Sequence, residues 1–373
     1  MDRRMILVMT MAAMSGVGVI GAEGEEKEVR PVWEARKVAS DPLFFVKPAG
    51  GAATALLLRV PLKAPVVRSA TLEKTYEAGR DYTWKEGTRE IVLVEGTRIP
   101  FKTEGELHPV ANAPHSYREQ RGGKAWMLFG EGRWFHDLQS VAAYEGADDW
   151  AGPEVAAAPD EQLGELRARL RRGETIRMVT LGDSISTGAN ASGSAAAPPM
   201  QGGYPDLVAA GLEERFGVKV AAKNLSVSGM DSAWGREQVG AVVTERPDLV
   251  LLAFGMNDAS GRRTPEEFAS ITGEIRDRIR KERSGCSVIV ISPMTANPEW
   301  SHSAPELYPA YAAALGKLAG AGTAAADVTA VWTAVAARKT YLSLTGNGLN
   351  HPNDFGHRLY ADVVLAVIGA PGR

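Results

Sequence analysis

The alternation of two kinds of segment beyond about residue 165 constrains the fold of this chain most. Apolar runs of strand length alternate there with amphipathic segments of helix length. Strands are expected at 176–181, 218–223, 248–253, 287–292 and 326–331, and helices at 204–216, 265–283 and 305–319. Because the connection between parallel strands usually contains a helix, this order predicts an α/β fold with a doubly wound parallel sheet over 165–373. Ligands bind such sheets beyond the carboxyl ends of the strands.

The region from 31 to 150 has a different pattern. Short alternating stretches, for example 55–60, 90–94 and 125–129, are separated by turns rich in Gly and Pro. This pattern predicts a small all-β sandwich, a jelly-roll-like accessory domain over 31–150. Residues 146–160 carry several Ala, Asp and Pro and are expected to form a linker.

Residues 1–22 have the layout of a secretory signal peptide. A basic start, Met1–Arg4, is followed by the apolar or small residues Met5–Ala22 and then by an acidic stretch. We therefore expect a secreted or periplasmic protein with no stable membrane insertion after cleavage. The alternative is an uncleaved membrane anchor, because the apolar stretch is close to the length that spans a bilayer.

Composition excludes several classes of function. Lys and Arg number 42 against 45 Asp and Glu, so the net charge of −3 offers no broad basic field for nucleic acid. The single cysteine, Cys286, excludes an internal disulfide and is expected to fill the core. The sequence shows no set of His, Asp and Glu residues with metal-ligand spacing, and we expect no cofactor and no metal.

Four loops at the expected ligand-binding edge carry side chains suited to acyl transfer. The first strand leads into Gly182-Asp183-Ser184, and the second into a loop that contains Gly229. Asn257 follows the third strand, and His351 precedes the last helix. Each loop alone would be interpreted as a turn or a helix cap. A serine hydroxyl attacks an ester only with a base nearby, and an Asn amide can donate to a developing oxyanion.

Taken together, the blocks at 182–184, 229, 255–258 and 351–353 resemble the SGNH (GDSL-type) hydrolase superfamily over about 170–370. The resemblance implies a flavodoxin-like sheet, Ser184 as nucleophile and His351 as general base. It also implies an oxyanion hole formed by the backbone N–H groups of Ser184 and Gly229 and the side chain of Asn257. With the N-terminal sandwich, the chain further resembles two-domain carbohydrate esterases that remove acetyl groups.

The chain departs from the family pattern at the triad acid, which usually lies three residues before the histidine. That position is Gly348, with Asn347 beside it. Three interpretations are open. In the first, a backbone carbonyl orients His351; in the second, an acid from elsewhere does so, and Asp354 is the nearest in sequence. In the third, the enzyme is impaired. His357 also fits an Asp-x-x-His spacing, but His351 is preferred, because the His-Pro-Asn block surrounds it and His357 is expected within the helix.

The remaining aromatic and histidine residues are weaker candidates. Trp300 and His302 follow the fourth strand and are a candidate substrate wall. His108, His115 and His136 are expected to be structural.

The sequence predicts a secreted serine esterase that hydrolyses short-chain, acetyl esters on carbohydrate through a Ser-His acyl-enzyme. Its expected partner is an acylated carbohydrate or another small ester. The alternatives are a catalytically impaired glycan-binding protein, or a lipase, thioesterase or acyltransferase that uses the same site.

Overall fold

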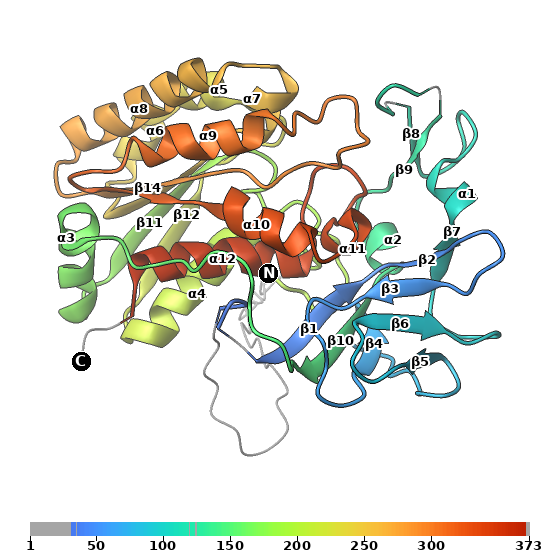
Figure 1. Ribbon diagram of the computed structural model, residues 1–373. Helices are drawn as coiled ribbons and strands as arrows, with labels where there is room; N and C mark the ends of the chain where they lie inside the picture. The colour runs from blue at the N-terminus through green and yellow to red at the C-terminus, as the bar shows by residue number, and fades with distance from the viewer. Residues whose placement is uncertain (1–30, 35, 119, 124, 371–373) are drawn as a thin grey trace, which may run out of the picture.

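The computed structural model describes residues 31–370 except 35, 119 and 124, so the predicted signal peptide lies outside the described residues. Figure 1 shows two regions side by side. The β region contains the strands between 37 and 145, and the α/β region begins at residue 160.

The α/β region is built on one five-stranded parallel sheet. Its strands are β11 (Ile176–Gly182), β12 (Val220–Asn224), β13 (Leu249–Ala253), β14 (Ser287–Ile291) and β15 (Thr323–Ala326). They lie in the order β12-β11-β13-β14-β15, and every neighbouring pair is parallel. This is the flavodoxin-like order, so the predicted fold class is confirmed. The strand order reverses between β11 and β13, which is the switch point where such sheets bind ligands.

Helices cover both faces of this sheet, as predicted. Figure 1 shows α5 (Ser232–Glu237), α6 (Val239–Thr244), α8 (Pro265–Glu282) and α9 (Leu307–Gly316) on one side, and α4 (Tyr204–Phe216) and α12 (Asp354–Ile368) on the other. The remaining helices of the region are α3 (Asp160–Arg171), α7 (Met256–Ser260), α10 (Val328–Ala336) and α11 (Tyr341–Leu344). Helix α8 begins with a capping box between Thr264 and Glu267 and with Pro265 in its first turn, so its start is specified locally.

The fifth strand was predicted at the wrong residues. We expected it at 326–331, but β15 ends at Ala326, and Val328 opens helix α10. The Asp327 side chain accepts a hydrogen bond from Ala330 N at 2.9 Å and caps that helix. The strand itself is the run Thr-Ala-Ala-Ala, in which Thr323 is the only β-branched residue and no residue is aromatic, so the usual strand signal is weak.

The β region contains two main sheets that share a core. One has the order β1-β10-β4 and the other β5-β6-β3-β2-β7, and Phe45, Val67 and Ile91 pack between them. The predicted β-sandwich is confirmed, although α1 (Glu104–Leu107) and α2 (Arg133–His136) each add a single helical turn. The strands are β1 (Lys37–Leu43), β2 (Phe45–Lys47), β3 (Thr54–Leu56), β4 (Val66–Ser69), β5 (Tyr82–Trp84), β6 (Glu90–Leu93), β7 (Phe101–Thr103), β8 (Ser116–Tyr117), β9 (Met127–Leu128) and β10 (Ser140–Glu145).

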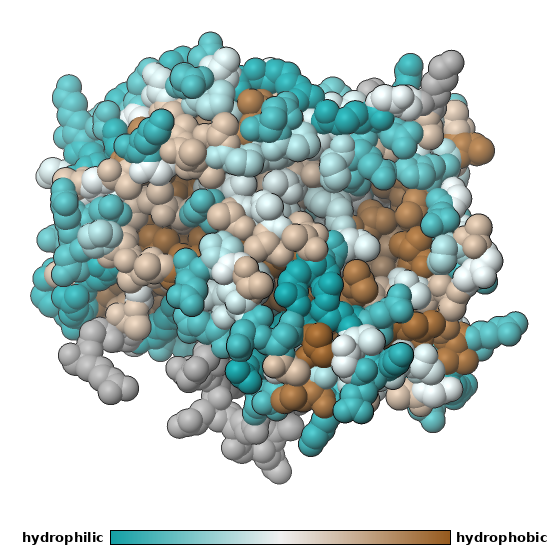
Figure 2. Space-filling model, viewed as in Figure 1, coloured by the Kyte–Doolittle hydropathy of each residue, from teal (hydrophilic) through white to brown (hydrophobic). Residues whose placement is uncertain are grey.

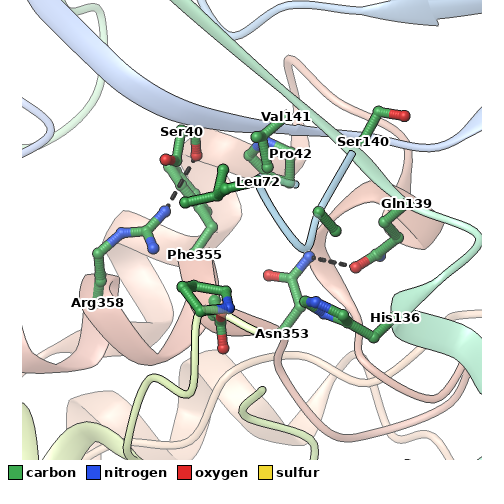
Figure 3. A pocket seen from close by; sticks show the side chains of 13 residues that line it. Ser40, Pro42, Leu72, His136, Gln139, Ser140, Val141, Asn353, Phe355 and Arg358 are labelled. Carbon is green, nitrogen blue, oxygen red and sulfur yellow. Dashed lines mark hydrogen bonds between the residues drawn. The ribbon is translucent and has the colours of Figure 1, made fainter. Parts of the chain in front are cut away.

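The β region is bound to the segment of the α/β region that surrounds His351. Gln139 Nε2 donates to Thr345 O at 2.7 Å, and Asn353 Nδ2 donates to Gln139 Oε1 at 3.1 Å. Arg358 Nη2 donates to Ser40 O at 3.0 Å. Figure 3 shows the last two contacts around a small pocket between the two regions. These bonds fix the position of the loop between α11 and α12 against the β region.

The molecular surface in Figure 2 shows hydrophobic residues in separate patches among hydrophilic ones. Most of the large exposed apolar side chains belong to the β region: Leu62, Val66, Leu72, Phe101 and Val110. Apolar side chains scattered in this way are common on protein surfaces. Within the described residues, no helix is long and apolar enough to cross a membrane.

Candidate active site

Strand β11 ends two residues before Ser184, so that Ser184 lies at the switch point of the sheet. A Cβ at Gly182 would lie 2.4 Å from Ala253 O of β13, so only glycine lets the two strands meet this closely. The Asp183 side chain then accepts a hydrogen bond from Ile185 N at 3.0 Å, which turns the chain directly around Ser184. Burial raises the pKa of Asp183 to about 7. The resulting turn holds Ser184 at the carboxyl edge of the sheet.

Ser184 and His351 lie within hydrogen-bond distance of each other. His351 Nε2 is 2.9 Å from Ser184 Oγ, and His351 Nδ1 is 2.7 Å from Asn190 Oδ1. A carbonyl oxygen can only accept, so Nδ1 carries the proton of the neutral ring and Nε2 is left to accept from the serine hydroxyl. This is the tautomer that a general base for Ser184 needs.

Two further groups stand beside His351 Nδ1. Asn347 Nδ2 lies 3.1 Å from it, and Glu131 Oε2, from the loop between β9 and α2, lies 3.7 Å from it. The Asn347 side-chain carbonyl oxygen accepts hydrogen bonds from the backbone N–H groups of Leu349 and Asn350, which leaves its amide nitrogen to donate to Glu131 Oε1 at 3.1 Å. Asn347 therefore shapes the histidine loop and also contacts the β region.

The pKa of Glu131 reflects this setting. Burial raises the pKa of its carboxyl group, but the contact with His351 and the hydrogen bonds of Asn347 and Asn190 outweigh burial, and the net pKa lies below the usual value. The ionised form is therefore favoured at neutral pH. Neither Asn190 nor Glu131 was identified from the sequence, because neither belongs to a recognisable motif.

Asp354, the acid considered from the sequence, makes a different contact. Its Oδ1 accepts from Ser192 N at 2.7 Å at the start of α12. The position that carries the acid in the family pattern, Gly348, has a φ of +92°. A Cβ there would lie 2.4 Å from Leu128 O in β9. The β region thus occupies the space that an aspartate side chain at 348 would need.

The loops that carry the predicted oxyanion donors lie at the same edge. Val227 N donates to Gly182 O at 3.2 Å and ties the loop of Gly229 to the end of β11. Asn257, in α7, donates through Nδ2 to Met230 O at 2.8 Å and so joins the third loop to the second. Among the described residues, no group of three or more His, Cys, Asp or Glu side chains is arranged to hold a metal ion.

Of the other sequence candidates, Trp300 and His357 occupy packed positions. Trp300 is only 7% exposed and belongs to the main core, so its ring offers little surface to a sugar, while His302 is exposed beside it. His357 is fully buried, with Nε2 3.1 Å from Ala189 O and Nδ1 accepting from Tyr204 N. Burial lowers the pKa of His357 to about 4. His357 therefore packs within the helix, as expected.

A serine and a histidine lie at hydrogen-bond distance, at the switch point of a flavodoxin-like sheet. This arrangement is that of a hydrolase domain of the SGNH type. The model of the GDSL-like Lipase/Acylhydrolase family matches residues 180–359, and the domain that contains them belongs to this family. The matched range includes Ser184, Gly229, Asn257 and His351, whereas Glu131 lies outside it.

Several solved structures are similar to part of this chain. A catalytic mutant of Axe2, an acetylxylan esterase from Geobacillus stearothermophilus, is 17% identical with a TM-score of 0.44, over 52% of this chain and 94% of that one. A two-domain esterase (CEX) active on acetylated mannans is 22% identical with a TM-score of 0.45, over 56% and 53%. The structure titled TesA is 23% identical with a TM-score of 0.40, over 50% and 96%. No curated protein matches the sequence.

Proposed function

We propose that this protein is an exported serine esterase that removes short acyl groups, acetyl above all, from carbohydrates. The observation that carries the proposal is the 2.9 Å separation of Ser184 Oγ and His351 Nε2 at the ligand-binding edge of the sheet. A serine hydroxyl needs such a base to become a nucleophile. Export rests on the signal-like layout of residues 1–22.

The reaction follows from this geometry. Ser184 Oγ attacks the ester carbonyl while His351 Nε2 takes its proton, and the new bond converts the carbonyl oxygen to an oxyanion. The backbone N–H groups of Ser184 and Gly229 and the amide of Asn257 donate to that oxyanion. The intermediate then breaks the bond to the sugar oxygen, which receives the proton from His351. Water, deprotonated by the same histidine, attacks the acyl-enzyme and releases acetate.

The surroundings of Asn257 support a polar substrate. A cavity of about 250 Å³ opens beside this residue. Its lining is polar and charged and includes Asp231, Arg262, Arg263 and Glu267. Sugar hydroxyls can exchange hydrogen bonds with such side chains, whereas a long acyl chain would need apolar walls. The cavity therefore favours a sugar ester over a lipid.

The proposal is tested by measuring acetate release from acetylated xylan and acetylated mannan, and hydrolysis of 4-nitrophenyl esters from acetate to longer chains. Ser184→Ala and His351→Ala are expected to abolish turnover, and mass spectrometry of the wild type should find an acetyl group on Ser184. His108→Ala, which changes a histidine of the β region, serves as the control and should retain activity.

Each other outcome favours one alternative. Glycan binding without serine-dependent hydrolysis of any ester would contradict the proposal and favour an impaired glycan-binding protein. A preference for long acyl chains or thioesters would favour a lipase or thioesterase. Transfer of the acyl group to an added alcohol in preference to water would favour an acyltransferase.

A further inference from the structure

We propose that Glu131, supplied by the β region, is the acidic positioning residue of the Ser184–His351 pair. This inference rests on the proposed function, because it assigns the acid that the same site lacks at Gly348. Glu131 acts through His351 and touches neither the ester nor Ser184.

The backbone around Glu131 is fixed to the histidine loop. Gly130 N donates to Asn347 O at 3.1 Å, and Asn347 Nδ2 donates in return to Glu131 Oε1 at 3.1 Å. Glu131 Oε2 is thereby held 3.7 Å from His351 Nδ1. Through these two hydrogen bonds, Asn347 both shapes the loop of His351 and positions the carboxylate of Glu131.

The two tasks of a triad aspartate are divided here between two residues. Such an aspartate fixes the histidine tautomer and stabilises the imidazolium that forms during the reaction. Asn190 Oδ1, 2.7 Å from His351 Nδ1, fixes the tautomer but carries no charge. Glu131 supplies the negative charge. Its side chain is 53% exposed, so solvent screens this charge and its effect is smaller than that of a buried aspartate.

Asp183 and His357 also interact electrostatically with His351. Asp183 follows β11 and has a pKa raised to about 7 by burial, so it is largely uncharged below that pH. His357, in α12, has a pKa lowered to about 4 by burial and is neutral above it. Between these values Glu131 is the ionised group that faces the ring, so loss of its charge is expected to change the pH dependence.

The test compares Glu131→Gln with the wild type, because glutamine keeps the length of the side chain and removes the charge. Both are assayed from about pH 5 to 9 by kcat/KM on 4-nitrophenyl acetate and by the rate at which a fluorophosphonate labels Ser184. An opposite charge beside the ring favours the charged imidazolium, even where solvent screens part of it. We therefore expect the acid limb of both profiles to move to lower pH in Glu131→Gln. The plateau should fall about tenfold, with little change in KM.

Two further variants make the result specific. Asp137→Asn removes an exposed carboxylate six positions along the same segment, which pairs with Arg133, and should keep the wild-type profile. Asn190→Asp in the Glu131→Gln background places a carboxylate on the side chain that already contacts His351 Nδ1, and should restore the acid limb and most of the rate. Partial unfolding would lower the amplitude of the profile without moving its midpoint.

The outcomes separate the inference from the function on which it rests. A wild-type profile in Glu131→Gln, with Ser184 still labelled, would overturn the role of Glu131 and leave the esterase proposal intact. Failure of the wild-type enzyme to label at Ser184 would overturn the esterase proposal and the inference with it.

Discussion

Replacing Gly348 by aspartate restores the acid of the family pattern, yet we expect it to weaken the protein. Gly348 has a φ of +92°, a conformation that an L-residue with a side chain adopts at a cost of about 1–2 kcal/mol. Its Cβ would also lie 2.4 Å from Leu128 O, a backbone atom that cannot rotate away. Forcing extra atoms into such a packed contact costs about 1–3 kcal/mol. Together the two effects amount to about 2–5 kcal/mol.

The loop has little freedom to move aside. Asn297 Nδ2 donates to Gly348 O at 2.8 Å, and Gly130 N donates to the neighbouring Asn347 O. We therefore expect Gly348→Asp to lower the free energy of unfolding in urea by this amount and to lower kcat/KM on 4-nitrophenyl acetate, because His351 is displaced with the loop. Gly348→Ala should lose nearly as much of both, since the added Cβ causes the damage.

The reasoning would be refuted by a Gly348→Asp variant that is as stable as the wild type, or more active than it. Either result would mean that the β region leaves room for an acid at 348, and that the absence of aspartate there needs another explanation. A large difference between the Ala and Asp variants would show that charge, and not steric overlap, dominates.

Three further expectations follow from single contacts. Asn257→Ala should lower kcat about 10²–10³-fold with little change in KM, measured by steady-state kinetics, and an unchanged kcat would remove Asn257 from the oxyanion hole. Lys339→Met leaves the fully buried Asp41 carboxylate without its cationic partner and should lower the unfolding free energy in urea by about 3–5 kcal/mol, while the double variant with Asp41→Asn should lose less than the two single losses combined. His357 has a folded-state pKa of about 4 against about 6.5 when unfolded, so the folded state binds fewer protons between these values. Stability should therefore decline as pH falls through this window, and His357→Gln should flatten the decline; an equal slope in both proteins would contradict this.

Local sequence signals determined most of the α/β fold. Apolar runs of strand length placed β11, β13 and β14 within a residue of their observed bounds, and Thr264 with Pro265 marked the start of α8. The fifth strand was misplaced because its alanines carry no strand signal of their own, and packing against β14 makes them a strand.

Ser184 and His351 could be identified from the sequence because each sits in a short motif at the end of a strand or the start of a helix. The groups around His351 Nδ1 could not be identified, because they meet only after the β region docks on the α/β region. Glu131 and Asn347 are 216 residues apart in the chain, and no local pattern connects them. The sequence shows only that Gly348 stands where the family pattern has an acid. The tertiary structure shows that β9 occupies the space that an acid at 348 would need, and that the β region brings the carboxylate of Glu131 to His351.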